Sequence, residues 1–129
     1  YAPCSVSASE VGMFANLKMV VLCNGNTASA AELFTAALRD YELAEIVGTK
    51  TYGKGSMQSI YSPSAFGEGY NGALKLTTKL YFPPCGEGYD GLGINPDVTS
   101  ELSDAAKEYN VYVLPQSVDD QLQAALKLF

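Results

Sequence analysis

The sequence predicts an α/β fold with a mixed sheet, on three observations. Residues 18–23 (KMVVLC) form an apolar run after one charge, which is typical of a strand buried on both faces. Residues 27–41 repeat apolar side chains at helical spacing. Residues 44–48 (AEIVG) form a second short run that favours a strand. A strand, a helix and a strand with short connections predict a βαβ unit.

The predicted helix follows the turn Asn24-Gly25-Asn26. We expect it to turn one apolar stripe toward the sheet. The members of this stripe are Ala30, Leu33, Phe34, Ala37, Leu38 and Tyr41.

The second half of the chain predicts shorter elements. A strand is expected over residues 57–61 and a longer one over residues 73–82, with a glycine-rich loop, residues 64–72, between them. On the longer strand, one face carries Leu74, Leu76, Thr78 and Leu80. Residues 49–55 and the turn-rich residues 85–98 are expected to be loops.

Near the C-terminus, residues 111–114 (VYVL) predict a short strand. A final helix is expected after Ser117 as its N-cap, with acidic residues in the first turn. Its apolar stripe would be Val118, Leu122, Ala125 and Leu126. Residues 1–16 predict mainly loop, with one helical turn expected around Val11, Phe14 and Leu17.

Length and charge exclude several classes of protein. At 129 residues the chain is expected to be a single domain, residues 1–129, with no internal boundary. Because it starts with Tyr1 and has no secretory signal, we expect it to be part of a larger protein. The net charge of −6 argues against nucleic acid as a partner, and no apolar run reaches the length of a membrane span.

Cysteine and histidine counts limit the chemistry. The chain has three cysteines without a CxxC pair and no histidine, which argues against a zinc site and excludes a Ser-His-Asp site within it. Acid–base chemistry must therefore use Lys, a carboxylate, Tyr or Cys. Cys23 is expected to be a small buried residue, and a disulfide between Cys4 and Cys85 stays open.

Ser29 supports two interpretations. With Glu32 three residues later it matches a capping box, in which the two side chains bind free N–H groups of the first turn. The same position beside a helix N-terminus suits a nucleophile, because the N–H of Ala30 would stabilise an oxyanion.

Lys54 also supports two interpretations. Residues 48–54 begin like a phosphate-binding P-loop, but Gly55 stands where Ser or Thr is required and a strand rather than a helix is predicted next. Lys54 is then either a solvated loop residue or a lysine among apolar groups, whose lowered pKa would suit a general base. Gly53 and Gly55 would let the backbone approach closely around it.

Gln58 lies four residues after Lys54 and its neutral amide could orient the lysine. It could equally be a polar residue on the exposed face of a strand, and Glu32 could be only a capping acid.

Five motifs in order give the chain a resemblance to a known family. They are residues 26–32 (NTASAAE), 48–58 (GTKTYGKGSMQ), 74–78 (LKLTT), 93–97 (GINPD) and 118–122 (VDDQL). From about residue 18 to residue 126 the chain resembles the catalytic region of the C-terminal processing peptidases, also called tail-specific proteases. That family consists of Ser–Lys serine proteases with a crotonase-like fold.

The resemblance assigns roles to the candidate residues. Ser29 matches the nucleophile, Lys54 the general base, Gln58 the residue that orients the lysine, and Ala30 an oxyanion-hole donor. Glu32 matches a supporting acid near the nucleophile in some members. The resemblance implies no metal or cofactor, and implies protein or peptide substrates that are cleaved at C-termini or in unfolded segments.

The resemblance also implies the setting of the chain. It would be the C-terminal part of a catalytic domain in an extracytoplasmic bacterial protein, whether periplasmic, membrane-anchored or secreted. A PDZ domain would lie in cis outside this sequence, and oligomers are compatible with the family. The chain departs from the family around residues 83–89 (PPCGEGY), where a Pro-Ser-Gly-Arg-like turn is usual. The alternatives are a non-catalytic crotonase-like module that binds a peptide or an apolar ligand and, with less support, acyl-CoA chemistry on the same fold.

Overall fold

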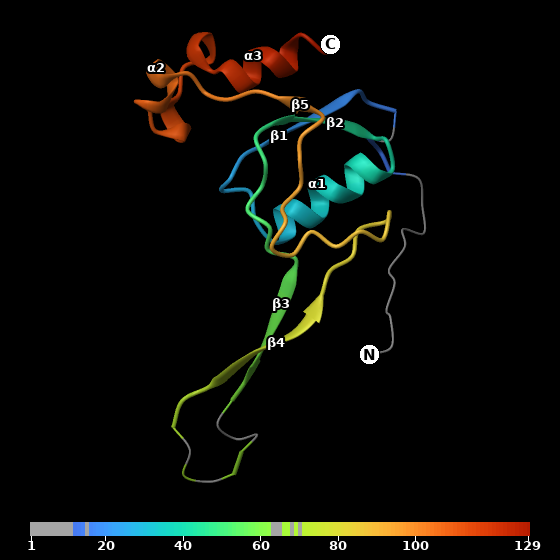
Figure 1. The fold of residues 1–129 in the computed structure, drawn as a ribbon, viewed down its shortest axis with the longest axis vertical. Coiled ribbons are helices and arrows are strands. Elements are labelled where there is room, and N and C mark those ends of the chain that lie inside the picture. The colour runs from blue at the N-terminus through green and yellow to red at the C-terminus, as the bar shows by residue number, and fades with distance from the viewer. Residues whose placement is uncertain (1–11, 15, 63–65, 68, 70) are drawn as a thin grey trace.

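The computed structural model describes residues 12–14, 16–62, 66–67, 69 and 71–129, whose first strand, helix and strand are followed by a two-stranded hairpin (Figure 1). In chain order the strands and helices are β1 (Met19–Cys23), α1 (Ala30–Asp40), β2 (Ala44–Gly48), β3 (Ser56–Tyr61), β4 (Leu74–Leu80), β5 (Val98–Thr99), α2 (Asp104–Lys107), the 3-10 turns η2 (Val111–Val113) and η3 (Gln116–Val118), and α3 (Asp120–Leu126).

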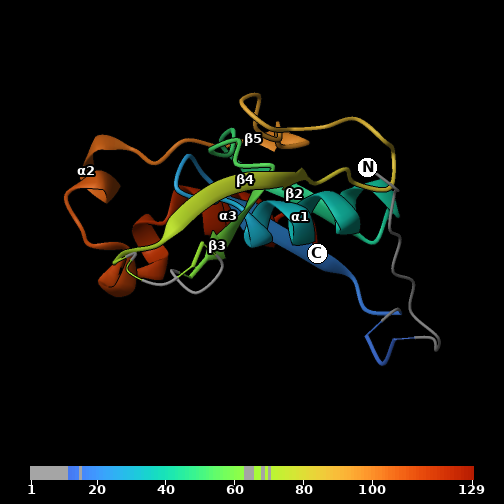
Figure 2. The ribbon, with the colours of Figure 1, turned by 90° about the horizontal axis from the view of Figure 1, so that it is seen from below.

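The predicted βαβ unit is present. β1 pairs in parallel with β2, β5 pairs in parallel with the other edge of β2, and α1 connects the first two strands. Helices α1 and α3 lie on opposite sides of this three-stranded sheet (Figures 1 and 2). The Asp97 carboxylate accepts a hydrogen bond from the Ile46 N–H at 2.8 Å, which holds the entry to β5 against β2.

Helix α1 buries a different stripe from the predicted one. The residues that point inward are Glu32, Thr35 and Ala36, whereas Phe34 and Tyr41 of the predicted stripe are 59% and 66% exposed. The prediction was wrong for Phe34 and Tyr41, whereas Leu33, Ala37 and Leu38 are half-buried. It missed Glu32 and Thr35 because it counted only apolar side chains. The polar residues of the inner stripe are buried with hydrogen-bond partners: Thr35 donates to the Ala31 carbonyl, and Glu32 accepts from backbone N–H groups of another loop. The helix also begins at Ala30 rather than Thr27.

Strand β1 is less buried than its sequence predicts. Only Cys23 is fully buried, and Leu22 is 41% exposed. β1 lies at the edge of the sheet in the described part of the chain, so its free side receives no cover from a further strand. The expectation for Cys23 is confirmed, since it is 2% exposed and its thiol donates to the Thr49 carbonyl.

Strands β3 and β4 form an antiparallel hairpin that extends away from the βαβ unit (Figure 1). Both predicted strands are confirmed with slightly different bounds, and β3 follows the lysine-containing loop where a P-loop would require a helix. The predicted apolar face of β4 is largely exposed, with Leu76 at 44% and Leu80 at 54%.

Two predictions near the C-terminus are corrected. Residues 111–113 form a 3-10 turn rather than a strand, and the Asn110 side chain caps it by accepting from the Tyr112 N–H. No neighbouring strand is present there in the described chain to pair with an extended segment. Asp119, not Ser117, caps the final helix, because its carboxylate accepts from the Leu122 N–H at 2.9 Å.

Some expectations fall partly or wholly on residues outside the described part of the chain. These residues include Cys4, Val11 and part of the loop at 64–72. None of the helices formed by the described residues is both long and apolar enough to cross a membrane.

Candidate active site

Ser29 lies at the junction between β1 and α1. The connecting turn is closed by its own polar groups: the Thr27 N–H donates to the Asn24 carbonyl at 2.8 Å, and the Thr27 hydroxyl accepts from the Asn24 N–H at 3.0 Å. The Asn26 N–H also donates to the Asn24 side chain at 2.9 Å. These bonds fix the turn that delivers Ser29 to the start of the helix.

The backbone of Ser29 is strained. Its φ of 57° and ψ of −117° lie in a region that non-glycine residues rarely adopt. A serine on a sharp, strained turn from a strand into a helix is the arrangement that exposes a nucleophilic hydroxyl in α/β-hydrolases. Ala30 follows as the first residue of α1, where an N–H has no acceptor within the helix.

Glu32 joins the backbone of Ser29 to the backbone of Lys54. The side chain is 0% exposed, and its Oε2 accepts from the Ser29 N–H at 2.8 Å and from the Lys54 N–H at 2.7 Å. Its Oε1 accepts from the Thr51 hydroxyl and the Gly53 N–H, both at 2.6 Å. The glutamate half of the predicted capping box is thus formed, and the same carboxylate also holds the loop that carries the lysine.

The charge of Glu32 is stabilised by these contacts. Burial raises the pKa of the carboxyl, but the hydrogen bonds from Thr51, Lys54, Gly53 and Ser29 outweigh it, and the net pKa is lowered. Glu32 is therefore an ionised acceptor at neutral pH. That state suits a residue that positions its neighbours rather than one that exchanges protons.

Lys54 lies in residues 49–55, which we call the lysine loop. Lys54 itself is half-buried. The loop is joined to the turn before Ser29 by the Tyr52 N–H, which donates to the Thr27 carbonyl at 3.0 Å. Gly53 has a φ of +92°, and a Cβ there would lie 2.8 Å from the backbone N of Gly93, which confirms that this backbone packs too closely for a side chain.

Gln58 lies on β3, immediately beyond the lysine loop. Its amide donates to the hydroxyls of Ser56 at 3.3 Å and Thr77 at 3.2 Å. Among the described residues, no hydrogen bond joins the side chains of Ser29, Lys54 and Gln58 to one another. The structure thus brings the backbone N–H groups of Ser29 and Lys54 to the Glu32 carboxylate. The roles of the Ser29, Lys54 and Gln58 side chains stay a prediction.

Sequence reasoning missed two residues beside the site. Thr51 is 5% exposed and its hydroxyl connects Glu32 to the Ile94 N–H, which donates to it at 2.7 Å. Tyr89 is 4% exposed, and its hydroxyl has no hydrogen-bond partner among the described residues. Burial and the nearby charge of Glu32 raise the pKa of Tyr89 to about 12. Thr51 lies inside the motif at residues 48–58, but no role was predicted for it, and Tyr89 belongs to none of the five motifs. The fold therefore identifies both residues.

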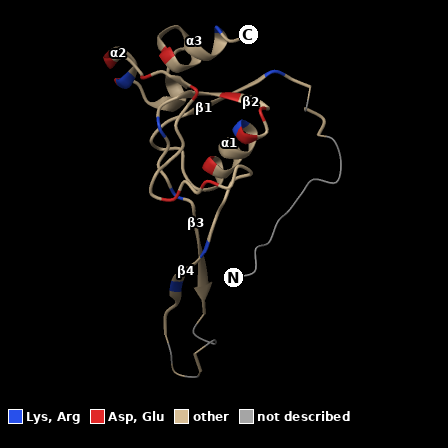
Figure 3. Cartoon of the chain, turned by 45° about the vertical axis from the view of Figure 1, so that its right-hand side comes forward, with Lys and Arg blue, Asp and Glu red and all other residues tan. Residues whose placement is uncertain are grey.

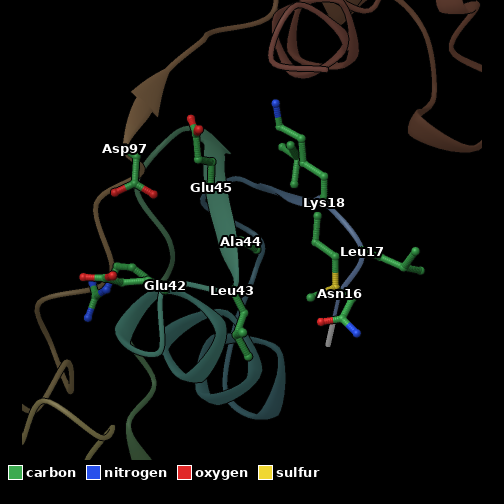
Figure 4. Close-up of a pocket in the computed structure, with 11 residues that line it drawn as sticks. Asn16, Leu17, Lys18, Glu42, Leu43, Ala44, Glu45 and Asp97 are labelled. Carbon is green, nitrogen blue, oxygen red and sulfur yellow. The ribbon is translucent and has the colours of Figure 1, made fainter. Parts of the chain in front are cut away.

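A cavity formed by described residues lies away from the residues of this site. It has a volume of about 500 Å³ and is lined at the start of β1, the end of α1 and the start of β2, whereas Ser29 follows the other end of β1. Figure 4 shows the side chains of Lys18 and Glu45 extending in the same direction beside this cavity. A smaller cavity of about 270 Å³ is lined in part by residues 24–26, the turn before Ser29.

The charges give no sign of a polyanion or metal site in the described chain. Figure 3 shows the Lys and Arg residues spread over several elements rather than gathered on one face. Within the described residues, no group of three or more His, Cys, Asp or Glu side chains could hold a metal ion.

Comparisons with known proteins agree with the resemblance found in the sequence. Residues 5–100 match Peptidase family S41. A carboxy-terminal-processing protease of Bartonella bacilliformis is 45% identical over 95 residues, which cover 72% of this chain and 21% of that protein. A "Probable CtpA-like serine protease" of Staphylococcus epidermidis is 39% identical over 84 residues, covering 65% of this chain and 16% of that protein.

A solved structure of a processing protease is also similar to this chain. The photosystem II D1 C-terminal processing protease superposes with a TM-score of 0.62 at 29% identity, over 83% of this chain and 27% of that one. The chain thus spans about a sixth to about a quarter of the length of these relatives. The match over residues 5–100, which exceeds half of the sequence, shows that the chain belongs to Peptidase family S41.

Proposed function

We propose that this chain carries the nucleophile and the general base of a serine endopeptidase, Ser29 and Lys54. The observation that carries the proposal is the shared carboxylate oxygen of Glu32, which accepts from the N–H of both residues at 2.8 Å and 2.7 Å. Two residues that are 25 positions apart (54 − 29) are thereby held to one atom. The strained backbone of Ser29 is a second, independent support.

The chemistry follows from these positions. The Lys54 amine takes the proton of the Ser29 hydroxyl as Oγ forms a bond to the carbonyl carbon of the peptide. The oxyanion is stabilised by the N–H of Ala30 at the start of α1. The C–N bond then breaks, and the leaving amine takes the proton from Lys54. Water hydrolyses the resulting ester by the same proton route, and Gln58 orients the Lys54 side chain.

The wider setting is part of the same proposal. The βαβ unit would belong to a crotonase-like catalytic domain, of which this chain supplies the C-terminal part. Substrates would be protein C-termini or loosely folded segments with apolar ends, presented with the help of a PDZ domain in cis in an extracytoplasmic protein. The names of the relatives, which include a carboxy-terminal-processing protease, support this substrate class.

The test replaces each residue of the pair in the intact protein. We expect Ser29→Ala and Lys54→Ala each to abolish cleavage of a fluorescence-quenched peptide with apolar C-terminal residues, while circular dichroism and the unfolding midpoint stay unchanged. Lys54→Arg should also be inactive, because arginine keeps its proton and cannot act as a base.

Lys50→Ala is the control, since Lys50 lies in the same loop but is exposed and has no role in the proposed mechanism. Retained cleavage in both Ser29→Ala and Lys54→Ala would reject the mechanism. If the wild-type protein bound the peptide and released no product, the non-catalytic peptide-binding alternative would replace it.

A further inference from the structure

Residues 89–94, which we call the covering loop, lie against the lysine loop. The Gly91 N–H donates to the Gly53 carbonyl at 2.8 Å. Two further hydrogen bonds join Thr51 and Ile94. The Thr51 N–H donates to the Ile94 carbonyl at 3.0 Å, and the Ile94 N–H donates to the Thr51 hydroxyl at 2.7 Å. The lysine loop is therefore held by hydrogen bonds to both Glu32 and the covering loop.

Asp90 of the covering loop binds the residue that follows Lys54. Its Oδ1 accepts from the N–H of Gly55, the next residue in the chain, at 2.8 Å. Gly55 is buried and has no side chain of its own to hold the backbone. The N–H of Lys54 is bound by Glu32 and the N–H of Gly55 by Asp90, so successive peptide groups around the lysine are fixed by two carboxylates.

We propose that Asp90 is a positioning residue for Lys54, acting through the Gly55 N–H. This inference rests on the proposed function. The lysine side chain has four rotatable bonds, so the direction of its amine depends on the backbone from which it starts. A shift of about 1 Å in a reacting group is enough to lower a rate about 100-fold. Without Asp90, the buried Gly55 N–H would have no partner and the peptide would turn to find one.

Two variants of Asp90 separate its hydrogen bond from its charge. Asp90→Asn keeps an acceptor oxygen for the Gly55 N–H and removes the charge. Asp90→Ala removes both. Asp119→Ala is the matched control, because Asp119 makes the same kind of bond, carboxylate to backbone N–H at 2.9 Å, at the start of α3.

The first readout is steady-state cleavage of a fluorescence-quenched peptide with apolar C-terminal residues by the intact protein. We expect Asp90→Ala to lower kcat about 10- to 100-fold with little change in KM. Asp90→Asn should restore the wild-type kcat and the wild-type pH profile. Asp119→Ala should leave both parameters unchanged when measured below its unfolding temperature.

The second readout does not need activity. The rate at which an amine-reactive acylating reagent labels Lys54 is followed by mass spectrometry as a function of pH. We expect the labelling profile of Asp90→Ala to differ from wild type, and those of Asp90→Asn and Asp119→Ala to coincide with it. This readout tests the positioning role even if the intact protein cleaves no peptide, an outcome that would count against the proposed function alone.

Wild-type labelling of Lys54 in Asp90→Ala would overturn the inference, as would an equal loss of kcat in Asp90→Ala and Asp119→Ala. An Asp90→Asn variant that behaves like Asp90→Ala would also overturn it, because the charge rather than the hydrogen bond would then matter.

Discussion

At the scale of single residues, Glu32 has two structural tasks. It binds the Ser29 N–H at the start of α1, as a capping glutamate does, and it binds the N–H groups of Gly53 and Lys54 across the site. Its full burial is tolerated because both carboxylate oxygens have two donors each. A single carboxylate in this position can accept hydrogen bonds from several N–H groups that point into the same buried space.

Glu32→Gln is expected to destabilise the protein in a pH-dependent way. The amide would turn an NH2 group toward two donors, which costs about 1–3 kcal/mol at neutral pH. Because the folded-state pKa of Glu32 is lowered, its contribution is present above the unfolded-state pKa of about 4.3 and is lost as pH falls through the folded value. The difference in unfolding free energy between wild type and variant should therefore shrink below about pH 4.

Urea titrations of both proteins at a series of pH values would measure this difference. Glu45→Gln is the control, because Glu45 is exposed on β2 and should leave the curve close to wild type. A difference between wild type and Glu32→Gln that stays constant down to pH 3 would contradict the proposed ionised state.

At the scale of elements, the contact between the lysine loop and the covering loop depends on close backbone approach. Gly93 has a φ of +71°, and a Cβ on it would lie 2.4 Å from the Thr51 carbonyl oxygen. Gly91 has nearly the same φ, +73°, but a Cβ there would meet nothing within 4 Å. An alanine at Gly91 would therefore add backbone strain alone, whereas an alanine at Gly93 would add the same strain and a steric conflict.

Gly91→Ala should cost about 1 kcal/mol of unfolding free energy, which is the strain of a positive φ. Gly93→Ala should cost about 1–3 kcal/mol more, because the added methyl group must displace the backbone of Thr51. Chemical denaturation of the two variants measures the costs. Equal values would show that the two loops are not packed as closely as the structure has them.

At the scale of the whole molecule, the hairpin of β3 and β4 carries apolar side chains without cover. Ile60 is 71% exposed and Leu80 is 54% exposed, and the hairpin extends away from the βαβ unit (Figures 1 and 2). A two-stranded hairpin is marginally stable alone in water, and exposed apolar patches of this kind promote association. The chain also spans only about a fifth of the Bartonella relative.

The 129-residue chain expressed alone is expected to self-associate through this hairpin. The double variant Ile60→Thr with Leu80→Thr should lower the apparent mass in light scattering, because threonine keeps β propensity and removes apolar area. Lys79→Gln on the same strand is the control and should not lower it. Unchanged association in the double variant would mean that another surface is responsible.

The sequence by itself determined the order of the elements and the candidate residues. Apolar runs and helical spacing predicted β1, α1 and β2 as a βαβ unit, because these patterns report burial along the chain. The strand after Lys54 excluded a P-loop, and the five motifs predicted the family to which the chain belongs. The same patterns failed for the inner stripe of α1, because hydrogen-bond partners distant in the sequence allow polar side chains to be buried there. They also failed for residues 111–114, because the described chain offers no neighbouring strand with which an extended segment could pair.

Only the tertiary structure decided how Ser29 and Lys54 are brought together. Spacing along the chain shows a cap at Glu32, but not that its second oxygen binds Thr51 and Gly53, 19 and 21 residues away. It also gives no sign of Asp90, whose bond to Gly55 spans 35 residues. Local patterns cannot predict such contacts, because a buried N–H can be satisfied by any acceptor that the fold brings within reach, and chain order does not say which.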